Sequence, residues 1–368
     1  MTPPARLDLT SDVASLTEAL LNIESVSLNE AGITDAIEAE LRGLTHLDVE
    51  RLGNSLIART SWGLPDRVVI AGHVDTVPLN NNLPARNDGR AIHGLGACDM
   101  KGGVAVALKL AAALTEASRD ITYVFYEAEE IASVHNGLRK IVEERPDLVQ
   151  ADFAILMEPS DAQVEAGCQG TLRVAVTTRG ERAHSARSWR GVNAIHRAAP
   201  ILQRLNEYEA RRPIIDGLEY HEGLNAVLID GGVATNVIPD ECRVTVNFRY
   251  APDRSEDDAI AYVRDYFDGF EIEVLDSAAG ALPGLDRPAA KAFLEAVGGE
   301  VRPKFGWTDV ARFTALDVPA VNFGPGDPML AHKQEEFVTI EQLRQCEDTL
   351  VRWLRSGEAA SRNHGSQA

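Results

Sequence analysis

The sequence predicts an α/β protein of two domains, in which a mainly parallel sheet forms the larger domain and a ferredoxin-like segment is inserted into it. The chain has 368 residues, which exceeds the usual size of a single hydrophobic core. Four short apolar runs, each followed by a turn-rich segment, are typical of strands that are buried on both faces of a parallel sheet. Between residues 171 and 280 the pattern changes to alternating strands and periodic helices.

The four apolar runs define the larger domain, which we expect over residues 1–170 and 281–368. The runs cover residues 67–71, 121–126, 152–157 and 319–323. Residues 100–117, between the first two runs, are rich in Ala and Leu and predict a helix that packs on the sheet. Strand, helix and strand in succession are the signature of an α/β domain.

The inserted segment, 171–280, predicts a smaller domain with the element order β-α-β-β-α-β. Strands are expected at 171–178, 225–229, 243–250 and 270–275, and helices at 192–211 and 255–267. Ser255 is a suitable N-cap for the second helix, and three acidic residues follow it in the first turn. This order is the ferredoxin-like arrangement.

Composition restricts the partners and the compartment. The formal net charge is -20, which disfavours nucleic acid and anionic membrane surfaces as partners. No run of 18 or more apolar residues predicts a membrane span, and residues 1–10 lack the apolar run of a secretory signal. The four cysteines are far apart and form no CxxC pair, which argues against a thiolate zinc site and a disulfide framework. We therefore expect a cytoplasmic protein.

Residues that commonly bind metals follow each of the four predicted strands. They are His73 and Asp75 after the first, Glu129 and Glu130 after the second, Glu158 after the third, and His332 after the fourth. In open α/β sheets, sites form outside the carboxyl ends of the strands, so residues spread over 260 positions can converge.

Each of these residues also has a simpler interpretation. His73-Val74-Asp75 alone is more often a capped turn, and Glu129-Glu130 alone is more often a solvated loop. The Gly-rich stretch 94–103 suggests a phosphate-binding loop, but its spacing is not that of a P-loop. Glu158 before Pro159 could simply end a strand. Their placement in one order along the chain favours a metal site over these separate explanations.

Five motifs resemble those of the M20 family of zinc peptidases and amidohydrolases. They are Gly72–Pro78, Gly94–Gly103 with Asp99 in its centre, Ala128–Glu130, Met157–Pro159 and Ala331–His332. The similarity extends over most of the chain. One position departs from the family pattern, because Ala128 stands where the family usually has Asp. That position is not a ligand in the family, so we expect little loss of function.

The resemblance implies two divalent metal ions. His73, Asp99 and Glu158 would bind one ion, and Asp99, Glu130 and His332 would bind the other, with the Asp99 carboxylate as the bridge. Nitrogen and oxygen ligands suit Zn²⁺ best, and Co²⁺ or Mn²⁺ also fit such a set.

Three further residues receive catalytic roles from the resemblance. Asp75 would accept a hydrogen bond from His73 and orient its ring. Glu129 would be the general base that takes a proton from water and passes it to the leaving amine. His184 would stabilise the oxyanion. Without the family match, a surface histidine would be the better interpretation of His184. In dimeric relatives this histidine reaches the site of the other subunit, which implies a homodimer and a lid that closes.

The resemblance implies an enzyme that hydrolyses a small N-acyl amino acid, and arginines in the inserted segment suggest that this substrate is anionic. Arginine binds carboxylates in bidentate fashion, and four arginines lie close together within 179–190. The candidate substrate-binding residues are Arg182, Asn236, Arg249, Thr308 and Gly324. Several of these arginines could instead form solvated ion pairs, which is the better interpretation of Arg190. Two alternatives stay open: another deacylase of the family, such as an N-acetylornithine deacetylase or an aminoacylase, and a catalytically silent binding protein of the same fold.

Overall fold

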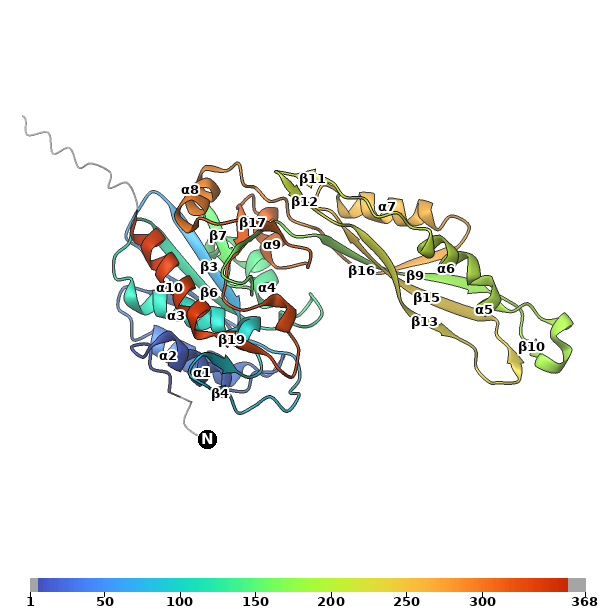
Figure 1. Cartoon of the computed structure of the whole chain (residues 1–368), viewed down its shortest axis with the longest axis horizontal. Coiled ribbons are helices and arrows are strands. Elements are labelled where there is room, and N and C mark those ends of the chain that lie inside the picture. The colour runs from blue at the N-terminus through green and yellow to red at the C-terminus, as the bar shows by residue number, and fades with distance from the viewer. Residues whose placement is uncertain (1–5, 357–368) are drawn as a thin grey trace, which may run out of the picture. The chain divides into compact units, whose positions relative to one another are not determined.

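The computed structural model describes residues 6–356, which form two compact units (Figure 1). Unit 1 comprises the described residues up to Ala166, Gly284–Arg302 and the described residues from Arg312 onwards. Unit 2 comprises Gly167–Pro283 and Pro303–Ala311. The division of the chain into domains at 171 and 280 stays a prediction, and the two units are described separately.

Unit 1 is built on an eight-stranded sheet in which the four predicted strands occupy the centre. The strand order is β1 (Asp48–Leu52), β2 (Ser55–Arg59), β6 (Asp120–Tyr126), β3 (Arg67–His73), β7 (Phe153–Leu156), β18 (Ala320–Asn322), β8 (Val164–Ala166) and β17 (Val301–Pro303). β3 pairs in parallel with β6 and β7, and β18 pairs in parallel with β7. Because these four strands are parallel, their carboxyl ends lie at one edge of the sheet.

Helices cover this sheet and bury its strands. They are α1 (Val13–Leu21), α2 (Ala31–Leu41), α3 (Gly102–Ala113), α4 (Gly137–Glu144), α8 (Pro288–Val297), α9 (Val310–Ala315) and α10 (Ile340–Arg355). α3 contacts β3, and α1 and α10 pack on α3 (Figure 1). Every residue of β6 is buried, as the apolar runs predict. The helix predicted at 100–117 is shorter than expected, because an irregular turn, Ala97–Lys101, precedes it.

A small three-stranded sheet lies at the edge of unit 1. It has the order β19 (Phe337–Thr339), β5 (Ala91–His93) and β4 (Arg86–Asn87). β19 pairs with β5 antiparallel, with Phe337 opposite His93. This pairing brings the segment after His332 next to the loop that contains Asp99.

Unit 2 contains a four-stranded antiparallel sheet with the order β13 (Gly223–Gly231), β15 (Glu241–Tyr250), β9 (Gly170–Arg179) and β16 (Glu271–Ala278). The helices are α5 (Ala194–Arg197), α6 (Ala199–Asn206) and α7 (Glu256–Tyr266). Along the chain the elements follow the order β-α-β-β-α-β, which confirms the predicted fold class.

Two details of unit 2 follow from single residues. Ser255 caps α7 with a reciprocal pair of hydrogen bonds: its hydroxyl accepts the N–H of Asp258, and its own N–H donates to the Asp258 carboxylate. The helix predicted at 192–211 is instead two short helices. Pro200 stands in the first turn of α6, where its missing N–H costs nothing, so a new helix begins there.

A two-stranded ribbon of β10 (Ala183–His184) and β14 (Val237–Ile238) extends unit 2, and a second ribbon is formed by β11 (Ile214–Ile215) and β12 (Leu218–Glu219). In the part of the chain that the structure describes, no helix has the length and apolarity needed to cross a membrane. All four cysteines are buried and unpaired.

Candidate metal centre

His73 ends β3 and is completely buried. Its Nδ1 lies 3.1 Å from the backbone oxygen of Asp75, which can only accept a hydrogen bond, so Nδ1 carries a proton. The lone pair of the neutral ring is therefore on Nε2. This atom faces Asp99 Oδ1 at 3.1 Å. Two lone-pair-bearing atoms at this distance need a proton or a cation to hold them together.

Asp99 lies in the irregular turn before α3, at the same edge of the sheet. One of its carboxylate oxygens faces His73, and the other, Oδ2, lies 3.4 Å from His332 Nε2. Asp99 and Met100 have non-helical backbone angles within this turn. A carboxylate whose two oxygens face two different histidines has the arrangement that a bridging ligand requires.

Glu130 and His332 complete the cluster. His332 Nε2 lies 2.9 Å from Glu130 Oε2, although 202 positions separate the two residues. His73, Asp99 and Glu130 each offer one ligand atom, and these three atoms all lie within 4.8 Å of one another. The structure therefore brings together four of the five predicted ligands.

Glu158, the fifth predicted ligand, is buried just beyond β7, the strand next to β3. It does not belong to the set of three that converges within 4.8 Å. Its position at the shared strand edge agrees with a ligand role, and that role stays a prediction.

Asp75 organises the centre through its carboxylate. Oδ1 accepts the N–H of Glu129 at 3.0 Å, and Oδ2 accepts the N–H of Glu130 at 3.1 Å. Oδ2 also accepts the hydroxyl of Ser27 at 2.7 Å, and Oδ1 lies 3.4 Å from His73 Nδ1. Asp75 thus positions both the expected base and one expected ligand, in addition to the His73 ring that the sequence analysis assigned to it.

The charges of the cluster depend on one another. Burial alone would raise the pKa of Asp99, but the hydrogen bonds with His332 and His73 lower it. Hydrogen bonds with Asp99 and Glu130 raise the pKa of His332 to about 10 in the metal-free protein. Burial opposes protonation of His73, yet Asp75 and Asp99 raise its pKa. Burial raises the pKa of Glu130. In the metal-free protein, the positive charge of protonated His73 and His332 therefore offsets the negative charge of the carboxylates around them.

These residues fit a divalent cation. The cluster offers imidazole nitrogens and carboxylate oxygens, a donor set that suits Zn²⁺, Co²⁺ or Mn²⁺. When His73 gives up its Nε2 proton, Nε2 and Asp99 Oδ1 both present lone pairs to the same space, which a cation can occupy in place of the proton. Cys98, next to Asp99, is buried, and burial raises the pKa of its thiol, so it stays a neutral packing residue.

Three carboxylate and hydroxyl contacts of the site were missed by sequence reasoning. Ser27 donates to Asp75. The buried Glu30 accepts the N–H of Ala128 at 3.1 Å, where Ala128 has a positive φ of 57° just before the Glu pair. Glu336 accepts three N–H groups of the Asp99 loop. The sequence carries little signal for them, because single acidic or hydroxyl residues in loops are usually solvated.

The predicted residues His184, Arg182 and Asn236 lie close together in unit 2. His184 is exposed and pairs with Val237 in the β10–β14 ribbon, and Ser185 N–H donates to the backbone oxygen of Asn236 at 2.9 Å. Ala186 N–H donates to His184 Nδ1 at 3.0 Å. Nδ1 is therefore the acceptor, and the neutral ring carries its proton on Nε2. This tautomer presents an N–H donor away from the backbone.

Several arginines of unit 2 are engaged in surface ion pairs. Arg182 donates to Asp240 from Nε at 3.1 Å and from Nη2 at 2.7 Å. Arg179 pairs with Glu241 and Glu271. The side chain of Arg249, half-buried on β15, makes no hydrogen bond or ion pair with the described residues, and burial together with the Arg173 charge lowers its pKa.

The remaining two predicted substrate-binding residues are buried. Thr308, in unit 2, is 5% exposed, and its hydroxyl lacks a hydrogen-bond partner among the described residues. Gly324, in unit 1, donates its N–H to Ser160 Oγ at 3.0 Å. A Cβ at Gly324 would lie 2.3 Å from the backbone oxygen of Met157, so only glycine lets this loop pack against the segment that carries Glu158.

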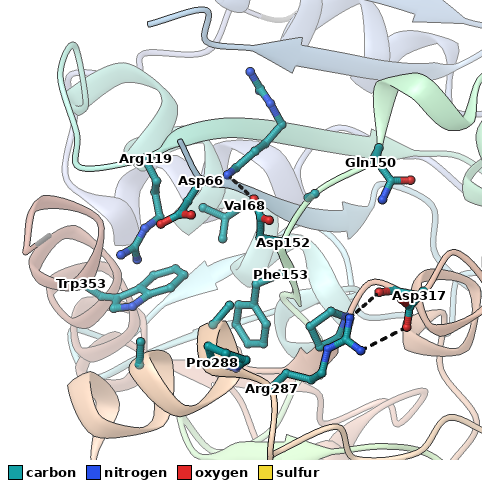
Figure 2. Close-up of a pocket in the computed structure, with 15 residues that line it drawn as sticks. Asp66, Val68, Arg119, Gln150, Asp152, Phe153, Arg287, Pro288, Asp317 and Trp353 are labelled. Carbon is teal, nitrogen blue, oxygen red and sulfur yellow. Dashed lines mark hydrogen bonds and ion pairs between the residues drawn. The ribbon is translucent and has the colours of Figure 1, made fainter. Parts of the chain in front are cut away.

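A cavity of about 600 Å³ lies at the opposite ends of the same strands (Figure 2). Residues at the starts of β3 and β7 line it, including Val68 and Phe153. Arg119 stacks over the Trp353 ring at 4.3 Å on one side, and Arg287 pairs with Asp317 on the other (Figure 2). The cavity contains none of the predicted metal ligands, and sites in such sheets form at the carboxyl ends of the strands. The metal cluster is therefore the candidate active site.

The fold and the cluster together define a metal-dependent hydrolase of the α/β class. The model of Peptidase family M20/M25/M40 matches residues 69–356. The chain therefore belongs to this family, which confirms the resemblance seen in its motifs.

Proteins of similar sequence or structure point to a particular group within this family. A Mycobacterium tuberculosis protein, DapE, named for succinyl-diaminopimelate desuccinylase, is 54% identical over 95% of this chain and 99% of its own. The succinyl-diaminopimelate desuccinylase of Corynebacterium glutamicum is 47% identical over 95% and 97%. A tripeptidase of Staphylococcus aureus has a similar fold, with a TM-score of 0.78 at 22% identity over 95% of this chain and 98% of its own.

Proposed function

We propose that this enzyme hydrolyses N-succinyl-LL-2,6-diaminopimelate to succinate and LL-2,6-diaminopimelate, a precursor of lysine. The convergence of His73, Asp99, Glu130 and His332 at one sheet edge is the observation that carries the metal-dependent hydrolysis. Identities of 54% and 47% over nearly the whole chain to proteins named for this activity support the substrate.

Two divalent cations, with Zn²⁺ as the first choice, would be held by the five predicted ligands. His73, Asp99 and Glu158 form one set, and Asp99, Glu130 and His332 form the other. Such a pair of cations would lower the pKa of a bound water and polarise the amide carbonyl of the substrate. The orientation of Asp99, with one oxygen toward each histidine, supports the bridging role.

Glu129 is the proposed general base. The Asp75 carboxylate accepts the backbone N–H of Glu129 and that of the neighbouring proposed ligand Glu130, which supports a base next to the metal centre. Glu129 accepts a proton from the attacking water and then delivers it to the nitrogen of the leaving amine. In this role the Glu129 carboxylate would exchange protons with water and with the leaving amine, and it would not be a ligand of the cations.

His184 is the proposed donor to the oxyanion. The hydrogen bond from Ala186 N–H to Nδ1 keeps the proton on Nε2, so the neutral ring can donate. As the family resemblance implies, unit 2 of this chain or of a second subunit would close over the substrate to bring His184 to it.

The substrate has three carboxylates, and the chain offers donors for them. Arg249 has no competing ion pair among the described residues, and the hydroxyl of Thr308 lacks a partner there. Arg182 would exchange its exposed pair with Asp240 for a substrate carboxylate. Asn236 adds an amide donor, and Gly324 lets its loop pack against the backbone of Met157 and Glu158.

A homodimer is proposed through the edge of the unit 2 sheet. β13 is an edge strand, and Val227, Leu228 and Ile229 on it are 51%, 63% and 52% exposed. Unprotected edge strands with exposed apolar side chains are ready to pair with another chain. We also propose a cytoplasmic location, which the four unpaired cysteines support.

A second candidate function is the deacetylation of N-acetylornithine. The acetylornithine deacetylase of Myxococcus xanthus is 32% identical over 77% of this chain and 78% of its own. A third, a silent binding protein, is disfavoured by the assembled ligand cluster.

The deciding experiment pairs metal analysis with a two-substrate assay. The purified chain is loaded with Zn²⁺ and given succinyl-diaminopimelate or acetylornithine at matched concentrations, with Glu129→Ala as the control for contaminating activity. We expect two metal ions per chain and a larger kcat/KM for the succinylated substrate. Faster turnover of acetylornithine would overturn the substrate, and absence of turnover with full metal content would support the silent protein.

A further inference from the structure

Glu336 lies in the segment between His332 and β19, and only 1% of it is exposed. Its carboxylate accepts three backbone N–H groups from one loop. Oε2 accepts from Gly96 at 3.0 Å, and Oε1 accepts from Cys98 at 3.0 Å and from Asp99 at 3.1 Å. The backbone oxygen of Glu336 accepts a fourth N–H, that of Gly94, at 3.1 Å.

These donors belong to the loop that presents Asp99 to the metal centre. Gly94 and Gly96 have φ angles of 155° and 78°, which L side chains rarely adopt. Residues 94–96 therefore lie outside regular helices and strands and lack the regular backbone hydrogen bonds of such elements. Buried N–H groups outside helices and strands need acceptors from elsewhere. Glu336 supplies them from a segment more than 230 positions away.

The same residue is close in sequence to a second ligand. His332 precedes Glu336 by only four positions, and its Nε2 lies 3.4 Å from Asp99 Oδ2. Moving the Glu336 carboxylate would therefore move the Asp99 loop relative to the His332 segment. The other carboxylate contact between these segments is that of Asp99 Oδ2 with His332 Nε2, and it belongs to the metal centre itself.

We propose that Glu336 is a positioning residue that sets the distance between the bridging carboxylate of Asp99 and His332 for cation binding. The inference rests on the proposed metal-dependent function. Glu336 does not touch the cations or the substrate; it acts through the backbone of the Asp99 loop. Its loss should weaken cation binding beyond what a general loss of stability would cause.

Asp120 provides a matched control for general stability. It is 4% exposed, and its carboxylate likewise accepts three consecutive N–H groups, those of Trp62, Gly63 and Leu64, at 2.8, 3.1 and 3.0 Å. Asp120 begins β6, whereas the metal centre lies beyond the end of this strand. The two carboxylates therefore share the same type of interaction at opposite ends of the sheet.

The experiment compares Glu336→Gln with Asp120→Asn. Each amide has only one oxygen, so at least one buried N–H loses its acceptor in either variant. The thermal midpoint of the metal-free protein and the Zn²⁺ dissociation constant, from competition with a chromophoric chelator, are measured without substrate. We expect a lower midpoint for both variants, and weaker Zn²⁺ binding, by about 10–100-fold, for Glu336→Gln alone.

Two outcomes would overturn the proposal: Glu336→Gln with the Zn²⁺ affinity of the unmodified protein, or an equal loss of affinity in Asp120→Asn. If Glu336→Gln does not fold, Glu336→Asp answers the question, because it keeps both acceptor oxygens but shortens the reach by one methylene. It should bind Zn²⁺ more weakly than the unmodified chain, and unchanged binding would refute the role. Failure of the unmodified chain to bind Zn²⁺ would instead refute the proposed function itself.

Discussion

Replacing Asp75 by Asn should damage the metal centre without changing the size of the side chain. The carboxylate accepts three hydrogen bonds at 2.7–3.1 Å, from the N–H groups of Glu129 and Glu130 and from the hydroxyl of Ser27. An amide has one oxygen, so its NH₂ group must face at least one of the two backbone N–H groups. Whichever way the amide is turned, one buried donor loses its acceptor.

The size of the effect follows from this count. One unsatisfied buried N–H costs about 1–3 kcal/mol of stability in the metal-free protein. Loss of the group that orients His73 and the two glutamates should also weaken Zn²⁺ binding by about 10–100-fold. At saturating Zn²⁺, kcat should remain low, because residue 75 no longer holds the backbone N–H groups of the base Glu129 and the ligand Glu130 together.

The assay measures the Zn²⁺ dissociation constant, the chemical-denaturation midpoint of the metal-free protein and kcat at saturating Zn²⁺. Ser27→Ala is the matched control, because it removes only the hydroxyl donor and leaves both N–H bonds to Asp75 in place. It should change all three quantities much less. An Asp75→Asn variant with unchanged Zn²⁺ affinity and unchanged kcat would refute the organising role of this carboxylate.

Four further outcomes are expected. Glu129→Ala should keep the metal content and lower kcat by about 10²–10⁴-fold, as determined by metal analysis and steady-state kinetics; unchanged turnover would exclude Glu129 as the base. His184→Ala should lower kcat by about 10²–10³-fold with a smaller change in KM, and a loss confined to KM would contradict the oxyanion role. Zn²⁺ binding should release a proton from His332 between pH 6.5 and about 10, because the ligand must be neutral whereas hydrogen bonds with Asp99 and Glu130 raise its pKa to about 10. The ion pairs of protonated His332 stabilise the metal-free protein fully below pH 6.5 and are lost as the pH rises through about 10, so Zn²⁺ affinity should increase over this range. Calorimetry in buffers of different ionisation enthalpy counts the protons released on Zn²⁺ binding. A count of zero would refute the raised pKa of His332. Leu228→Asp on the exposed edge strand β13 should shift the chain from dimer to monomer in light scattering, and an unchanged mass would remove β13 from the proposed interface.

Some elements could be predicted because their signals are local. The four central strands of unit 1 are continuous apolar runs, and the cap of α7 is a single serine followed by acidic residues. The helix expected at 192–211 was too long, because helical periodicity alone does not mark the break before Pro200, where α6 begins. A helix or strand can be predicted from the sequence when its own apolar pattern and its capping residues specify where it begins and ends.

The same distinction applies to the candidate site. Histidine and acidic residues after successive strands were visible in the sequence, because parallel strands place their carboxyl ends together. Ser27, Glu30 and Glu336 were not, because their importance depends on which backbone N–H groups they meet. In the sequence, an acidic residue whose buried carboxylate accepts the N–H groups of a loop cannot be distinguished from one that is solvated.

By itself, the sequence determined the class of the protein, the four central strands of unit 1 and the residue types at the candidate site, since these follow from periodicity, residue type and motif. Only the tertiary structure decided that Asp99 turns one oxygen to each histidine, that Asp75 holds the backbone of both glutamates, and that Glu336 ties the Asp99 loop to the His332 segment. The physical reason is that hydrogen bonds and cation sites require approach within about 3 Å, and the residues concerned are separated by up to hundreds of positions along the chain.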